Sequence, residues 1–191
     1  IFAKNSVMEQ LEYYNNFEDS LQRELIKLCN SLGVLDSVLL NSEDIDLKWG
    51  DYADEYMADA IEQINDYPEV AIAWAAYMGM AVAKWWDADW KKKRNNGYKM
   101  FYGPKGFDDM DDYIVEKILG FPLNSIEARQ IVGVTYSMAQ QAINIIRKEQ
   151  IEFGTSKAFY VLSRTVKVMY RVGAAIQLRR MGYKMEKMNL S

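Results

Sequence analysis

Histidine is absent from this 191-residue sequence. Because histidine is the side chain that most often acts as a general acid or base near neutral pH, its absence excludes Ser-His-Asp and Cys-His catalysis within this chain. Zinc, haem and di-iron sites that use histidine ligands are excluded with it. Any catalysis here would have to depend on other side chains, above all on carboxylates.

Cysteine is nearly absent as well. Cys29 is the only one, so no internal disulfide can form and a reducing compartment is expected. The stretch from Ile1 to Val7 lacks the charged-then-apolar pattern of a signal peptide. The longest uncharged apolar run, residues 70–83, is shorter than the roughly 20 residues that a membrane span needs. We therefore expect a cytoplasmic chain without a membrane span.

Residues that interrupt regular structure are few. The chain has 3 prolines and 11 glycines, and half of its residues are hydrophobic. A long sequence with so few turn signals favours helices over strands. We expect a single all-α domain over 1–191, a helical bundle of about five or six helices. The uncharged run places its central helix at about 68–94, buried on all sides.

Apolar residues three and four positions apart predict where the helices lie. The expected ranges are 5–32 (with a possible break at 15–16), a short helix at 34–40, 42–67, 68–94, 108–119, 124–152 and about 156–181. The apolar faces of these helices include Leu11, Ile61 and Phe159. Asn124 with Glu127 resembles a capping box at the start of the fifth main helix.

Excess charge is also small, since the formal net charge is -4. Nucleic-acid binders usually carry a basic face and a high pI, so we expect no nucleic-acid partner. The average conceals an asymmetry: residues 155–191 carry a local charge of +7, and the rest of the chain carries -11. Such a division of charge can mark an interaction surface.

An acidic ridge follows one face of the expected helix 42–67. Its carboxylates, spaced four, four, three and four residues apart, are Asp51, Glu55, Asp59, Glu62 and Asp66. Three interpretations remain open: a solvated polar face, a contact with a basic stripe, or an Mg²⁺ or Mn²⁺ site with Asp51, Glu55 and Asp59 as ligands. The basic stripe comes from the last helix and consists of Lys157, Arg164, Lys167 and Arg171.

A second carboxylate cluster is the run Asp108, Asp109, Met110, Asp111 and Asp112. It resembles the Asp-Asp-x-x-Asp motif by which isoprenoid synthases hold Mg²⁺ and a diphosphate. The resemblance is limited to these residues, because the chain is short for that fold and has no second metal-binding motif downstream. Acids are also expected at the start of a helix for dipole reasons alone. Asp108, Asp109 and Asp112 are the candidate ligands.

Aromatic residues gather at the end of the expected central helix. Tryptophan and a few charged side chains can line a ligand pocket, although tryptophans at helical spacing are more often part of the core. The pocket candidates are Trp85, Trp86, Asp89, Trp90, Tyr102 and Lys105.

The C-terminal residues form a basic run. Four cations, Arg179, Arg180, Lys184 and Lys187, alternate with Met181, Met185 and Met188. Such a run can bind membranes or acidic partners, or it can simply be a solvated tail.

Two functions follow from these patterns. The first is a non-catalytic helical interaction or regulatory protein that self-associates as a homodimer or binds a protein partner, because aromatic residues and methionine are enriched at interfaces. The alternative is an Mg²⁺- or Mn²⁺-dependent enzyme that acts on a phosphorylated or diphosphate substrate through the two carboxylate clusters. No other cofactor is expected, and the absence of histidine favours the first function.

Overall fold

A computed structural model describes the backbone of residues 2–185 and the side chains of residues 4–185. Over these residues the chain is an all-α bundle without strands, apart from one isolated bridge between Gly103 and Gly106. Its helices are α1 (Phe2–Ser31), α2 (Glu43–Gln63), α3 (Pro68–Lys93), α4 (Met110–Tyr113), α5 (Ile126–Lys148) and α6 (Ser156–Arg180). A 3-10 turn, η1 (Tyr98–Phe101), and a π-helical turn, η2 (Ile114–Ile118), lie between α3 and α5. The predicted fold class is confirmed.

α3 is the central helix, as its composition predicts. It packs against α2, α4, α5 and α6, and its contact with α6 is the most extensive in the fold. Pro68 occupies its first turn, where a missing N–H costs nothing. Nearly every side chain from Ala71 to Ala83 is buried; Trp74, half-buried, donates its indole N–H to the Phe107 carbonyl at 2.7 Å. A helix that is apolar all round requires this coverage.

Two glycines allow α3 and α6 to approach closely. A Cβ on Gly79 would collide with the backbone of Tyr170, and a Cβ on Gly173 would collide with the backbone of Ala76. Neither position has room for a methyl group. The absence of a side chain at both glycines therefore sets the distance between the two helices.

The capping residues explain where most helices begin. Ser42 accepts a hydrogen bond from the Ile45 amide at 3.2 Å, and Thr155 accepts one from the Ala158 amide at 3.2 Å. The expected cap of α5 at Asn124 is wrong by one residue, because Ser125 accepts from the Ala128 amide at 3.1 Å.

Other boundaries also differ from the sequence prediction. α1 is continuous through residues 15–16, and residues 34–40 form no helix. α2 ends at Gln63 and α5 at Lys148, which leaves longer connections than expected. The range 108–119 contains only the single turn of α4 and the π-helical turn η2. The ends of these segments are polar or contain glycine, and such residues do not reveal which positions tertiary packing will cover. Local periodicity therefore predicts helices that are too long.

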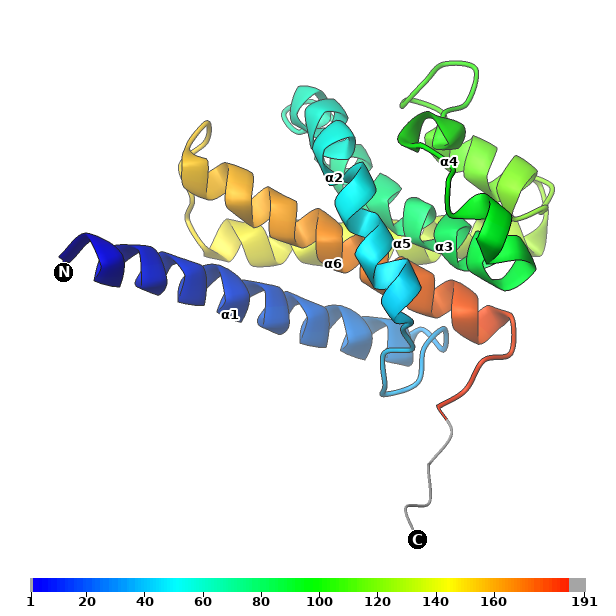
Figure 1. Cartoon of the computed structure of the whole chain (residues 1–191), viewed down its shortest axis with the longest axis horizontal. Helices are drawn as coiled ribbons and strands as arrows, with labels where there is room; N and C mark the ends of the chain where they lie inside the picture. Colours follow the sequence, from blue (N-terminus) through cyan, green and yellow to red (C-terminus); the bar gives the residue numbers. More distant parts are fainter. Residues whose placement is uncertain (1, 186–191) are drawn as a thin grey trace, which may run out of the picture.

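Figure 1 shows α1 along one edge of the bundle, with α6 beside it and α2 crossing α6. The connection between α5 and α6 lies at the same end of the molecule as the first turns of α1 (Figure 1). None of the helices in the described range combines the length and the hydropathy that crossing a membrane requires.

Candidate functional site

The aromatic candidates at the end of α3 are mostly structural. Trp85 is buried and stacks on Phe101, with ring centroids 4.9 Å apart, while Trp86 lies 5.4 Å from the ring of Tyr183. Trp90 is half-buried against the core. These contacts secure η1 and the C-terminal segment to α3. A ligand pocket there stays a prediction.

The charged pocket candidates nearby, Asp89 and Lys105, take part in hydrogen bonds that involve the backbone. Asp89 has non-helical dihedral angles (φ -163°, ψ 76°), which mark a kink in α3. It accepts a hydrogen bond from the Lys92 amide at 3.3 Å and so caps the last turn of the helix after the kink. The Lys105 backbone amide donates to both carboxylate oxygens of Asp109, at 3.0 and 3.1 Å. The Lys105 side chain itself is exposed.

Asp59 joins the acidic ridge to η1. The Tyr98 hydroxyl donates to its Oδ2 at 2.7 Å, and the Tyr102 hydroxyl donates to the same oxygen. Burial and this carboxylate raise the pKa of Tyr102 to about 12, so the phenol remains a proton donor at neutral pH. Tyr102, a pocket candidate, thus positions the loop through Asp59.

Most carboxylates of the two clusters are exposed. Asp51 pairs with Lys48 at 2.9 Å, Glu55 is exposed, and Asp108 and Asp112 are exposed at α4. In the part of the chain that the structure describes, no group of three or more acidic or cysteine side chains is arranged to hold a metal ion. The Mg²⁺ or Mn²⁺ site stays a prediction.

Of the three interpretations of the acidic ridge, the contact with the basic stripe is wrong, because that stripe pairs with carboxylates outside the ridge. Glu18 of α1 accepts from Arg164 at 2.8 Å and lies 3.4 Å from Lys167 and 3.9 Å from Arg171. Arg171 also pairs with Asp46 at 3.0 Å. One buried carboxylate of α1 thus lies opposite three cations of α6. Only the packing of α1 on α6 reveals this contact.

The basic run that begins in the last turn of α6 is partly used within the fold. Arg179 binds the Gly33 carbonyl at 2.9 Å and Asp36 at 3.3 Å, and the guanidinium of Arg180 lies 5.6 Å from the ring of Phe121. Burial lowers the pKa of Arg180. Of the other residues in this run, Lys187 and Met188 lie outside the described residues.

The first turns of α1 carry an apolar stripe that nothing in the fold covers. It is the start of a heptad stripe along the whole of α1, with alternating steps of four and three, in which Glu18 is the one charged member: Val7, Leu11, Tyr14, Glu18, Leu21, Leu25 and Leu28. From Tyr14 onward it packs against the bundle, but Val7 and Leu11 are 65% and 52% exposed. Leu11 was expected on a covered face, and that expectation is wrong.

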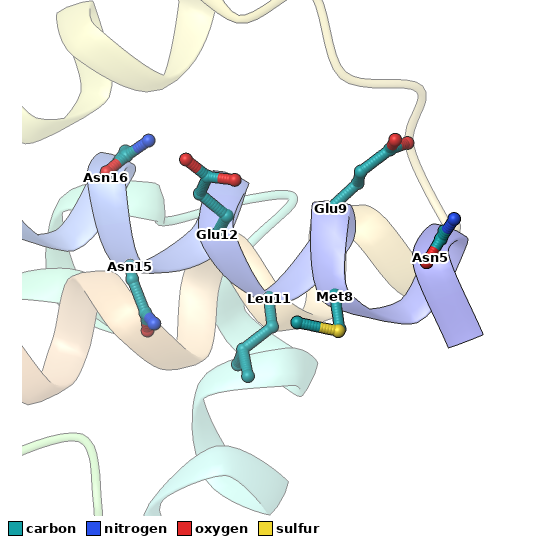
Figure 2. A pocket seen from close by; sticks show the side chains of 7 residues that line it. All are labelled: Asn5, Met8, Glu9, Leu11, Glu12, Asn15 and Asn16. Carbon is teal, nitrogen blue, oxygen red and sulfur yellow. The ribbon is translucent and has the colours of Figure 1, made fainter.

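Figure 2 shows the outer side of this segment, where Glu9 and Glu12 extend to one side of the helix and Met8 and Leu11 to the other. The hollow of about 510 Å³ along it is lined by residues of α1 alone. One helix cannot enclose a ligand, so this is an open face and not a cavity. We call residues 4–12, all of them exposed, the α1 extension.

A polar hollow of about 460 Å³ lies between the α1 extension and the start of α6. There the Tyr13 hydroxyl donates to Glu149 at 2.7 Å, and Lys157 lies 4.5 Å above the Tyr13 ring. Burial, followed by the Glu149 contact, raises the pKa of Tyr13. These contacts fasten α1 to the connection after α5.

The strongest candidate site is an apolar groove of about 480 Å³ where the end of α2 meets the α5–α6 connection. This volume is in the range of ligand pockets. Its lining is almost wholly aliphatic or aromatic, and we call it the apolar groove: Ile61, Ile64, Asn65, Ile146, Ile151, Phe153, Gly154, Thr155, Ala158, Phe159, Val161 and Leu162.

Three large apolar side chains stand exposed at the rim of the apolar groove. Phe153 is 73% exposed, Ile61 45% and Phe159 42%. Ile61 and Phe159 were expected to face the core, and those expectations are wrong, because the α5–α6 connection does not fold over them. One sequence signal could have revealed the groove. The short connection between the two helices contains a glycine and two large apolar residues, Ile151 and Phe153.

The chain was compared with protein-family models, with curated proteins and with solved structures, and none of them matches it.

Proposed function

We propose that this chain is a non-catalytic helical interaction protein that binds an apolar segment of a partner protein in the apolar groove. One observation carries the proposal: the groove is a preformed hollow with Ile61, Phe153 and Phe159 exposed at its rim. Covering such side chains gains about 25 cal/mol per Å² of apolar surface removed from water. Exposed apolar patches of this kind mark interaction sites.

The chemistry of the lining supports binding over catalysis. Asn65 and Thr155 are its only polar side chains, and neither titrates near neutral pH. The Thr155 hydroxyl is already committed, because it accepts from the Ala158 amide and donates to the Glu152 carbonyl at 2.7 Å. The groove therefore offers apolar contact and shape without an acid, a base or a nucleophile.

Selection from a displayed library of helical peptides tests this function. Peptides enriched on the natural chain should bind at least tenfold more weakly to the Phe153→Ser and Ile61→Ser variants, which lose rim contacts. Both residues are exposed, so these variants should keep the fold. Ile126→Ser is the matched control, because Ile126 is 82% exposed at the start of α5, outside the groove. Enriched peptides that bind all variants equally would overturn the proposal.

Self-association is the second part of the proposed function, and the α1 extension supports it. Val7 and Leu11 continue a heptad stripe whose later members are buried, which is typical of a helix awaiting another helix. In an antiparallel pair of α1 extensions, Val7 of each copy packs against Leu11 of the other.

A further inference from the structure

We propose that the occupant of the apolar groove is an amphipathic helix with lysine or arginine along one flank, lying against the acidic ridge of α2. This inference rests on the proposed function and names the class of partner. In this arrangement the apolar side chains of the helix fill the groove, and its cations face the carboxylates.

The acidic ridge begins at the groove. Glu62 follows Ile61, and Asp66 follows Asn65, so both carboxylates lie next to lining residues. Glu55 and Asp51 lie further along α2, and at about 1.5 Å per residue the helical part of the ridge extends over about 16 Å from Asp51 to Glu62. An apolar hollow that continues into a long charged stripe fits an elongated amphipathic partner better than a small molecule.

The chain leaves most of these carboxylates without a cation. Among the described residues, Glu55, Glu62 and Asp66 form no ion pair and are exposed, whereas Asp51 pairs with Lys48. Asp59 is occupied by tyrosine hydroxyls. The basic stripe of α6 pairs with Glu18 of α1 and not with the ridge. The negative charge beside the groove is therefore available to an outside partner.

The periodicity of the ridge selects a helix as the complementary element. Its carboxylates recur every three or four residues, and cations on a partner helix recur at the same spacing. A nucleic acid or an anionic membrane would be repelled by the same charges. The α1 extension of a second copy is a poor match, because it carries Glu9 and Glu12 against a single Lys4.

Two cations of α5 beside the groove bear on the orientation of the partner. Arg147 and Lys148, exposed at the end of α5, follow the lining residue Ile146. A helix with cations on both flanks would meet these residues with like charge. A cationic flank that faces α2 avoids these two cations and meets the acidic ridge.

Three synthetic helices of about 18 residues test the inference. They share one leucine face, and their α2-facing flank carries lysine, glutamine or glutamate. Affinity for the full chain is measured by fluorescence anisotropy in low and high salt. The lysine helix should bind about tenfold more tightly than the glutamine helix at low salt, and the glutamate helix should bind most weakly. High salt should reduce the difference, because it screens exposed charges.

Charge reversal locates the contact. Glu62→Lys should weaken the lysine helix several-fold and strengthen the glutamate helix. Asp19→Lys is the matched control, because Asp19 is exposed on α1 outside the groove and its reversal changes the net charge equally. A lysine helix that responds equally to both variants binds through general charge attraction, and that outcome overturns the inference.

The remaining outcomes separate this inference from the proposed function. Equal binding of all three helices, lost in Phe153→Ser, overturns the charged flank and leaves the apolar groove as the binding site. Binding of none of the three overturns the cationic helix as the occupant, and the library selection then decides the proposed function by itself. Melting temperatures of the variants equal to that of the natural chain confirm that each result concerns binding.

Discussion

Glu18 of α1 and Arg164 of α6 form an ion pair, with Oε2 and Nη1 2.8 Å apart. The same carboxylate lies near Lys167 and Arg171, and Arg164 also donates to Asn15 at 2.7 Å. The side chain of Glu18 is only 12% exposed. This carboxylate therefore links α1, the longest helix of the fold, to three cations of α6.

Removal of the Glu18 charge should destabilise the protein. Glu18→Gln removes the carboxylate that three neighbouring cations of α6 share, and we expect a loss of about 1–3 kcal/mol in the free energy of unfolding. A double-mutant cycle with Arg164→Gln, followed by urea denaturation, should give a coupling of at least 0.5 kcal/mol. The exposed pair Glu24–Lys27 is the control, with about 0.3–0.5 kcal/mol expected. Additive effects at Glu18 and Arg164 would contradict the contact.

The glycines between α3 and α6 give a second prediction. Gly79→Ala or Gly173→Ala forces a methyl group into the facing backbone, and we expect a loss of about 1–3 kcal/mol or more. Gly133→Ala in α5 is the matched control, because no atom lies within 4 Å of its added Cβ. This control should gain about 0.5–1 kcal/mol, since alanine favours a helix. Thermal denaturation with equal shifts for the three variants would refute the close approach.

Asp111 makes stability depend on pH. Burial raises its pKa from 3.8 to about 6, so between these values the folded protein holds a proton that the unfolded chain releases. Its contribution to stability is therefore complete below about pH 4 and is lost as the pH rises through about 6. Asp111→Asn should raise the melting temperature at pH 7 more than at pH 4. Equal gains in melting temperature at pH 7 and at pH 4 would contradict the raised pKa of Asp111.

The α1 extension predicts the oligomeric state. Light scattering should give a dimer mass at high micromolar concentration, and Leu11→Glu should give a monomer, because it places a charge in the paired stripe. Leu47→Glu is the control, since Leu47 is 69% exposed on α2 and lies outside the stripe. A monomer mass for the natural chain would disprove the pairing of α1 extensions.

The sequence by itself determined the helices and the centre of the bundle. The uncharged run of α3 allows only a covered helix, and Pro68, Ser42 and Thr155 specify where three helices begin, because these effects act within a few residues of the chain. The absence of histidine likewise restricted the possible chemistry before any fold was known.

Only the tertiary structure decided which apolar and charged side chains find partners. Leu11, Ile61 and Phe159 have the spacing of core residues, yet the bundle ends before it covers them. The cations of α6 could have faced carboxylates of α1 or of α2, and packing placed Glu18 of α1 opposite them. Periodicity gives the face on which a side chain lies, but what that face meets depends on helix lengths and crossing points that only the assembled chain defines.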